Sequence, residues 1–385
     1  MAPIFVDTDT NFCYNRGMKF ICDGEDLKTA MAIVGHGTNS KTVNPILEGI
    51  KIEAKGNEVT FFATDLELYI RKTIHADVKQ EGSALLPGKL FGEYIGKIGQ
   101  GQITFTSSDT TAVVEHGEGN DGNFSCMPVN EYPDLIDLNT KPLFYLKGAD
   151  LREIISKTVP FTAQDNARPV LRGALFDVDQ NSNTLTAVAL DGYRLARITK
   201  PLVRPTGSAK LIIPSRALEE MRRMLTDDKE EIGLMVDKKF VQIEIGSTVF
   251  ASRLIDGDFV NYRQIIPTEF NTNVVVETAP LLAAVSRAGL LLGSNKINLL
   301  TLTTADKSLE LYANNDMGQI NERVPANLDG TNIKIAFNSK YMFDALNTIT
   351  DEFVKLSFTT PLAPCVVTSA KRGDYLFLVL PVRLG

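Results

Sequence analysis

The stretch Ala189-Leu190-Asp191-Gly192 has two counterparts in the same chain, Ala63-Thr64-Asp65-Leu66 and Ala313-Asn314-Asn315-Asp316. The first alanines of the three stretches lie 126 and 124 residues apart. Each stretch follows a run with the composition of a β-strand, at residues 59–62, 184–188 and 309–312. Because Asp and Asn tolerate tight turn geometry, each stretch is predicted to begin a hairpin turn at Asp65, Asp191 or Asn315.

Helices are predicted at matching places in the three copies. In each copy a short extended stretch leads into a helix, and Pro87, Pro214 and Asn338 mark the junction at intervals of 127 and 124 residues. Another helix opens each copy, and alternating strands close it near Phe124, Phe250 and Tyr375. The six predicted helical windows are 26–35, 87–98, 149–158, 215–225, 280–291 and 339–349.

Two helices and several antiparallel strands in each copy predict an α+β fold with three tandem domains. A period this long indicates domain triplication, because solenoid repeats run over roughly 20–50 residues. Pro, Thr and Asn interrupt the pattern near 139–142 and 267–272. The predicted organisation is a poorly ordered extension at 1–17 and domains at 18–139, 140–269 and 270–385.

Composition points to a globular protein of a reducing compartment. The 385 residues are 44% hydrophobic and 23% charged, and no apolar run approaches the ~20 residues that span a bilayer. The N-terminus lacks the pattern of a secretory signal. Four scattered cysteines form no CxxC pair, which argues against a zinc site or a disulfide framework. We therefore expect a cytoplasmic protein without a membrane segment.

Charge is distributed unevenly along the sequence. The formal net charge is −7, whereas the six helical windows contain ten basic and seven acidic residues. A surface lined by all six helices would therefore be positive on an acidic protein. Helices that simply carry mixed, solvated charge explain the same sum equally well.

Motifs for catalysis or metal binding are incomplete. Gly35–Thr42 approaches a phosphate-binding loop, but Ser40 replaces its second glycine and the segment follows a helix. Asp177, Asp179 and Asn181 resemble the start of a calcium loop that lacks its turn glycine and its final glutamate. The three histidines form no HExxH pair. We therefore expect a scaffold with no catalytic residues, metal or cofactor, and keep two alternatives: an enzyme of nucleotide metabolism using Gly35–Thr42, and an acidic adaptor without a DNA role.

Several motifs together resemble those of one family. They are Pro45-Ile46-Leu47, Leu86-Pro87-Gly88-Lys89, Arg168-Pro169-Val170-Leu171-Arg172-Gly173, Leu190-Asp191-Gly192-Tyr193-Arg194-Leu195-Ala196, Phe337-Asn338-Ser339-Lys340-Tyr341 and Leu380-Pro381-Val382-Arg383-Leu384. From Met18 to Leu384, the chain resembles the β subunit of bacterial DNA polymerase III, the family of sliding clamps.

This resemblance implies a head-to-tail homodimer, in which two three-domain chains form a six-domain ring with the helices facing the hole. Such a ring encircles double-stranded DNA without reading sequence and tethers the replicative polymerase, which makes it a processivity factor and not an enzyme. The implied partners are a second copy, duplex DNA, the polymerase catalytic subunit, the clamp loader and repair proteins that carry a clamp-binding motif.

The resemblance also implies functional residues. The DNA contacts are Lys41, Lys89 and Arg168. A pocket for partner peptides, between the second and third domains, is lined by Leu171, Leu190, Gly192, Tyr193, Arg194, Leu195, Val260, Ile265, Asn338, Tyr341, Leu362, Pro364, Leu380, Pro381, Val382, Arg383 and Leu384. Ordinary core packing explains Leu190, Leu195 and Ile265 equally well. Gly385 extends past the usual terminal leucine, which would shift the terminal carboxylate near the pocket. Tyr193 and Val382 stand where other members often have His and Met, so the preferred peptide motif can differ.

Overall fold

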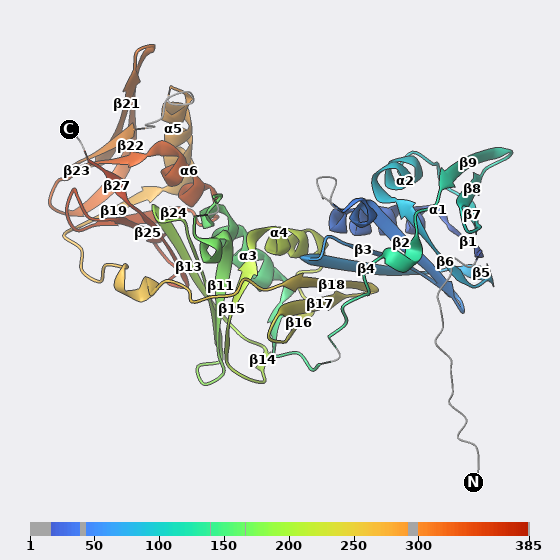
Figure 1. The fold of residues 1–385 in the computed structure, drawn as a ribbon. Coiled ribbons are helices and arrows are strands. Elements are labelled where there is room, and N and C mark those ends of the chain that lie inside the picture. The colour runs from blue at the N-terminus through green and yellow to red at the C-terminus, as the bar shows by residue number, and fades with distance from the viewer. Residues whose placement is uncertain (1–16, 39–43, 139, 166, 292–298, 384–385) are drawn as a thin grey trace, which may run out of the picture. The chain divides into compact units, whose positions relative to one another are not determined.

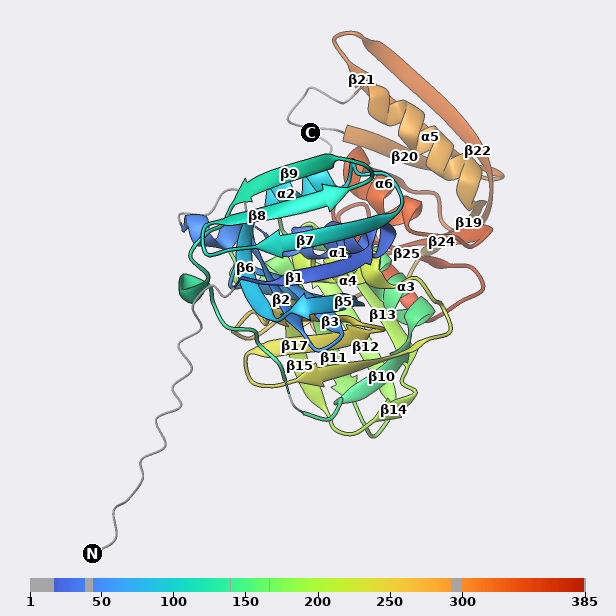
Figure 2. The same ribbon diagram turned by 90° about the vertical axis from the view of Figure 1, so that its right-hand side faces the viewer.

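The computed structural model describes residues 17–38, 44–138, 140–165, 167–291 and 299–383 (Figures 1 and 2). The chain divides into two compact units. Unit 1 contains Met1–Lys141 and Leu234–Arg253, and unit 2 contains Pro142–Gly233 and Leu254–Gly385. In the described part of the chain, no helix has the length and hydrophobicity of a membrane span, and no three acidic, histidine or cysteine side chains are grouped to hold a metal.

In unit 1 the helices α1 (Gly24–Val34) and α2 (Gly88–Ile95) pack beside each other (Figure 1). One sheet has the strand order β5-β1-β7-β8-β9. These strands are β1 (Lys19–Asp23), β5 (Asp77–Gln80), β7 (Gln102–Ser107), β8 (Thr111–His116) and β9 (Asn120–Ser125). The other strands run in the order β16-β17-β18-β4-β3-β2-β6. They are β2 (Gly49–Lys55), β3 (Glu58–Thr64), β4 (Leu68–His75), β6 (Gly82–Pro87), β16 (Glu231–Val236), β17 (Phe240–Ile245) and β18 (Thr248–Arg253).

The described residues of unit 2 form four helices, α3 (Gly148–Thr158), α4 (Ser215–Met224), α5 (Thr278–Leu290) and α6 (Ser339–Asn347). Its main sheet has the order β15-β11-β12-β13-β26-β25-β24-β19-β22-β21-β20-β23-β27. The first part contains β11 (Gly173–Asp179), β12 (Thr184–Leu190), β13 (Arg194–Pro201) and β15 (Ala209–Pro214). The remainder contains β19 (Thr272–Glu277), β20 (Leu299–Ala305), β21 (Ser308–Asn315), β22 (Gly318–Gly330), β23 (Lys334–Asn338), β24 (Phe353–Phe358), β25 (Cys365–Ser369), β26 (Tyr375–Val379) and β27 (Pro381–Val382). A short pair joins β10 (Phe144–Lys147) to β14 (Arg204–Pro205).

The six predicted helices are confirmed, and four of them, α1, α2, α4 and α6, begin next to a residue that favours a helix start. Asp23 caps α1 by accepting backbone N–H groups of Glu25 and Asp26, and Asn338 caps α6 through the N–H of Lys340. Pro87 and Pro214 directly precede α2 and α4. α5 and α6 lie side by side (Figures 1 and 2).

The three predicted hairpin turns are confirmed as well. Asp65 and Asp191 each accept two backbone N–H groups from the residues that follow, and Asn315 accepts one from Met317. The turns after β3 and β12 close with the pairs Thr64↔Tyr69 and Leu190↔Leu195. The turn after β21 is tighter, because Asn315 pairs directly with Gly318.

Successive copies of the repeat are joined by antiparallel strand pairing. β18 of the second copy pairs with β4 of the first, which explains why the segment Leu234–Arg253 belongs to unit 1. In the same way β26 of the third copy pairs with β13 of the second, within unit 2. The predicted residue boundaries of the three domains stay a prediction.

Candidate partner-peptide site and DNA-contacting residues

The turn between β12 and β13 orients the first residues of the site. The Oδ1 atom of Asp191 accepts the backbone N–H groups of Tyr193 and Arg194, at 2.9 and 3.1 Å. Gly192 has a φ of +94°, which only glycine adopts without strain. This backbone path leaves the side chain of Tyr193 60% exposed and directs Arg194 into the protein.

Arg194 connects three separate segments of unit 2. Its side chain is only 7% exposed. The Nε atom donates to Oδ2 of Asp191 at 2.9 Å, and Nη2 donates to the carbonyl oxygen of Pro160 at 2.7 Å. The remaining nitrogen, Nη1, forms an ion pair with Asp344 of α6. Because buried guanidinium groups require such partners, Arg194 fixes α6 and the end of α3 against β13.

Two tyrosines stack above this arginine. The rings of Tyr193 and Tyr341 have centroids 5.9 Å apart and planes inclined by 23°. The guanidinium carbon of Arg194 lies 4.6 Å from the centroid of Tyr341. Burial raises the pKa of the Tyr341 hydroxyl, which therefore stays neutral near pH 7. The exposed ring of Tyr193 and its rigid support offer a flat apolar surface.

An apolar cluster lies next to these groups. Leu171, Leu190 and Leu195 are buried in it, and Val260 and Leu380 pack against it while remaining partly exposed. The cluster thus joins residues of both the second and the third copy. Its other buried members are Ala163, Leu175, Val188, Ile212, Tyr262, Val366, Leu376 and Leu378.

The end of the chain borders the same region. The backbone N–H of Leu380 donates to the carbonyl oxygen of Tyr193 at 2.9 Å. Pro381 and Val382 form β27 and pair with Phe337 and Ala336 of β23. Because proline has no N–H to donate to a strand ladder, the sequence predicts that Pro381 turns the tail away from the sheet, and this pairing shows that the prediction is wrong. Because β27 is an edge strand, the missing N–H of proline does not interrupt the ladder.

The remaining predicted site residues are less tightly connected. Asn338 is half-buried and uses its side chain to cap α6. Ile265 is 40% exposed, while its neighbour Ile266 packs against the apolar cluster. Leu362 is 68% exposed and Pro364 is half-buried, both on the connection from β24 to β25. Arg383 is exposed, and Leu384 lies outside the described residues.

Sequence reasoning missed the residues that hold Arg194. Asp344 and Pro160 are its partners, and neither belongs to a motif. The available signal for Asp344 was a single acidic residue in an otherwise apolar stretch of helix, Met342 to Leu346. When an acidic side chain on a helix is buried against a neighbouring element, its carboxylate needs a cation as a partner, because an unpaired buried charge is costly in free energy.

The equivalent turn of unit 1 has different chemistry. Leu68 and Tyr69 stand where Arg194 and Leu195 stand in unit 2. Tyr69 packs edge-on against Phe240, with ring centroids 5.8 Å apart, and lies in an apolar cluster of its own with Leu47 and Phe62. In the described residues, the combination of a buried arginine with stacked tyrosines therefore belongs to the Asp191 turn.

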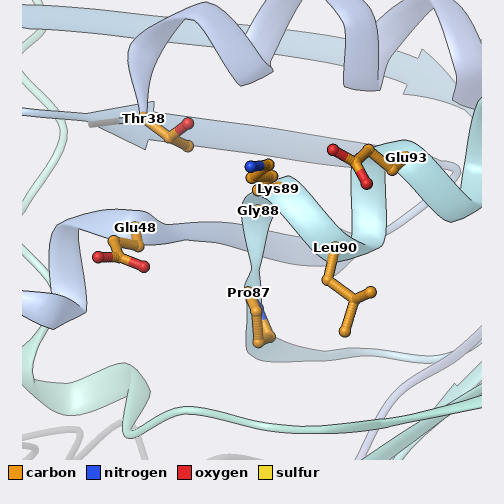
Figure 3. Close-up of a pocket in the computed structure, with 7 residues that line it drawn as sticks. All are labelled: Thr38, Glu48, Pro87, Gly88, Lys89, Leu90 and Glu93. Atoms are coloured by element: carbon orange, nitrogen blue, oxygen red, sulfur yellow. The ribbon is translucent and has the colours of Figure 1, made fainter. Parts of the chain in front are cut away.

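Two of the three predicted DNA contacts, Lys89 and Arg168, lie at the starts of helical segments. Lys89 is the second residue of α2, and Arg168 precedes the 3-10 turn Pro169–Arg172; both are exposed. Neither forms an ion pair with any described residue. Lys41 lies outside the described residues. Lys89 also borders a cavity of about 300 Å³ (Figure 3), whose other lining residues are Thr38, Glu48, Pro87, Gly88, Leu90 and Glu93.

The positive helical charge is smaller at the surface than the sequence sum indicated. Lys157 of α3 is buried and so contributes nothing to a DNA-facing surface. Five other basic helical residues are paired with carboxylates: Arg152, Arg222, Arg223, Arg287 and Lys340. In the described part of the helices, Lys28, Lys89 and Lys97 carry no ion pair, and all three belong to α1, α2 or the turn after α2.

Comparison with known proteins covers nearly the whole chain. Models of the DNA polymerase III beta subunit match residues 18–137 as its N-terminal domain, 145–261 as its central domain and 263–383 as its C-terminal domain. The beta sliding clamp of Staphylococcus epidermidis is 30% identical over 353 residues, which cover 89% of this chain and 93% of that protein. The Staphylococcus aureus clamp is 28% identical over the same shares.

Comparison with solved structures finds the same family. The DNA polymerase sliding clamp of Bacillus subtilis superposes with a TM-score of 0.91 at 27% identity, covering 96% of this chain and 100% of that one. The structure of a putative DNA polymerase III beta subunit from Eubacterium rectale has a TM-score of 0.90 at 27% identity, covering 95% of this chain and 99% of that one. The chain, with its three tandem clamp domains, therefore belongs to the DNA polymerase III beta subunit family, the sliding clamps.

Proposed function

We propose that two copies of this chain close head to tail into a six-domain ring around duplex DNA. Partner proteins would be tethered through the Asp191 region, which consists of the turn at Asp191, the stacked rings of Tyr193 and Tyr341 above Arg194, and the adjoining apolar cluster. Members of the sliding clamp family are processivity factors and have no active site of their own. A ring needs no tight DNA affinity, since it is retained by topology. Tethering raises the effective concentration of a polymerase at its template, to the order of mM for a short flexible link.

The observation that carries the ring is the repeated strand pairing. β4 with β18, and β13 with β26, join each copy to the next. The counterpart of β4 and β13 in the third copy is the first half of β22, and the counterpart of β18 and β26 in the first copy is β9. β9 lies at the edge of its sheet. Pairing β22 of one protomer with β9 of the other would continue the pattern and satisfy both strand edges.

Large apolar side chains are exposed to solvent near the start of β22. Leu290, the last residue of α5, is 79% exposed, and Met317 in the turn before β22 is 85% exposed. The side chain of Asn315 donates to the carbonyl oxygen of Leu291, which places the end of α5 beside this turn. Beside β9, α2 packs through Phe91 on Phe124 and carries Leu90, which is 59% exposed. Exposed apolar groups of this size favour a protein interface.

Contact with DNA would be electrostatic and independent of sequence. Lys89 and Arg168 are exposed and form no ion pair with the described residues, as such contacts require, and Lys41 is the third predicted contact. Weak phosphate contacts suffice because the ring holds the DNA.

The Asp191 region would bind short motifs of the polymerase catalytic subunit, the clamp loader and repair proteins. Its partly exposed apolar residues next to the tyrosine stack suit Leu or Phe anchors of a peptide. Burying one such anchor contributes roughly 1.5–3 kcal/mol, so a few anchors give affinities on the order of micromolar.

A cytoplasmic location is part of the proposal. Cys22, Cys126 and Cys365 are free thiols, and burial raises the pKa of Cys22 to about 12, so this thiol is unreactive.

The alternative of a nucleotide enzyme has less support. Gly35–Gly37 continue directly from α1 as a 3-10 turn, whereas a phosphate-binding loop follows a strand, and residues 39–43 lie outside the described residues. ATP turnover by the purified protein that is abolished by Lys41→Ala would support this alternative.

Retention on DNA tests the ring directly. After loading by the cognate clamp loader, the protein is expected to co-elute with nicked circular DNA and to be lost when that DNA is cut once. A protein held by chemical affinity alone would stay on both forms equally, and that result would contradict the proposal.

A further inference from the structure

Lys157 is a buried lysine whose strongest contact is not with a carboxylate. Its side chain, on the last turn of α3, is 2% exposed. The Nζ atom donates to the carbonyl oxygen of Thr348 at 2.7 Å, while the nearest carboxylate, Glu153, is 3.7 Å away. The same atom lies 4.2 Å above the ring centroid of Tyr375. Burying an ammonium group costs free energy, so its partners determine its position closely.

The acceptor is the end of another helix. Thr348 is the C-cap of α6, and α6 has no basic residue in its own last turn. Carbonyl oxygens at a helix C-terminus lack intrahelical partners and carry partial negative charge. Lys157 therefore supplies from α3 the cation that α6 does not supply for itself.

α6 carries residues of the proposed peptide site. Tyr341, in its first turn, stacks on Tyr193, and Asp344 binds Arg194. The helix is thus held to the second copy by two buried cations, at Asp344 and at Thr348, four residues further along. Two attachments about one turn apart restrict both the position and the rotation of the helix.

We propose that Lys157 is a positioning residue for the partner-peptide site, because it fixes the C-terminal end of α6 and so keeps Tyr341 stacked on Tyr193 before a peptide arrives. This inference rests on the proposed function of that site. Without Lys157, Asp344 would be the remaining place where a buried cation holds α6 to the second copy, and part of the binding free energy would be spent on ordering the helix.

Lys200 provides a matched control in the same unit. Its side chain is 9% exposed, and its Nζ atom lies 2.5 Å from Glu153, 3.0 Å from Asp374 and 3.6 Å from Asp150. None of these carboxylates is on α6 or in the peptide site. Burial opposes the charge of both lysines; it lowers the pKa of Lys157, whereas hydrogen bonds to Glu153 and Asp374 raise the pKa of Lys200.

The experiment compares Lys157→Met with Lys200→Met in the full chain. Peptide affinity is measured by calorimetry with a synthetic peptide that carries the clamp-binding motif of the cognate polymerase catalytic subunit, beside the same peptide with its Leu and Phe residues changed to Ala. Amide hydrogen exchange of Ser339–Asn347 is followed without peptide. Lys157→Met is expected to weaken binding roughly fivefold or more and to accelerate exchange in α6. Lys200→Met should lower Tm and leave both readouts unchanged.

The outcomes separate the inference from the proposed function. Equal affinity for wild type and Lys157→Met, or an equal loss in both lysine variants, overturns the positioning role. Absence of peptide binding by the wild type overturns the proposed site and this inference with it. If Lys157→Met does not fold, Lys157→Gln replaces it, and the same comparison with Lys200→Met decides.

Discussion

Arg194 illustrates how much of the site depends on single side chains. Its guanidinium group reaches Asp191, Pro160 and Asp344, and it also supports the ring of Tyr341. The turn chemistry of Asp191 and Gly192 was predictable from sequence, because Asp and Gly have well-defined turn preferences. The pairing with Asp344 was not, since the two residues are 150 positions apart and no local pattern connects them.

The prediction of DNA contacts also concerns individual side chains. Changing Lys41, Lys89 and Arg168 together to Glu is expected to lower the amount of clamp loaded on primed circular DNA by several-fold, because each reversal replaces attraction to phosphate with repulsion. The defect should grow as the salt concentration is lowered, because the attraction in wild type and the repulsion in the variant are then both screened less. The triple variant should remain a dimer in native mass spectrometry.

Lys238→Glu is the control for charge alone. Lys238 is exposed in the turn between β16 and β17 and forms no ion pair in the described structure. If the triple variant loads as well as wild type, or no worse than Lys238→Glu, these three residues do not contact DNA.

At the scale of elements, helices were more predictable than the chain end. The windows predicted from apolar spacing match α1 to α6 within a few residues. Pro381 and Val382 were expected to leave the sheet and instead form β27. A two-residue edge strand has no periodicity, and its partner β23 lies about 45 positions earlier, so only the tertiary fold determines it.

Deleting Val382–Gly385 tests the role of this end in peptide binding. The deletion removes one of the two pairs between β27 and β23 and leaves Leu380 and its hydrogen bond to Tyr193 in place. We expect peptide affinity to fall below detection in calorimetry while Tm changes by only a few degrees, since Val382 is only half-buried and Arg383 is exposed. Deleting Gly385 alone is the control and should leave the affinity close to that of wild type.

Two results would contradict this reading of the chain end. Unchanged peptide affinity would place the binding site elsewhere, and a truncated chain that unfolds would make the end a structural element.

At the scale of the whole molecule, triplication was readable from sequence, but the connections between copies were not. The period of about 125 residues and the three turns at Asp65, Asp191 and Asn315 predicted three copies. The hairpin of β17 and β18 nevertheless belongs to unit 1, because β18 pairs with β4. Strand pairing between copies depends on backbone hydrogen bonds, which carry no residue-type signature, and so sequence patterns could not reveal it.

The same pairing rule leads to the prediction for assembly. If β22 of one protomer meets β9 of the other, Leu290 and Met317 become buried at the contact, and charges placed there would have to be desolvated. Wild type is expected to have about twice the 42.3 kDa mass of the chain by native mass spectrometry at micromolar concentration, and Leu290→Glu with Met317→Glu is expected to be a monomer. Leu362→Glu, at another exposed leucine, should remain a dimer. A wild-type monomer in low salt would refute the ring. A double variant that stays dimeric would not contradict the ring, but it would show that the contact between protomers lies away from β22. Two buried carboxylates at that edge are incompatible with the pairing.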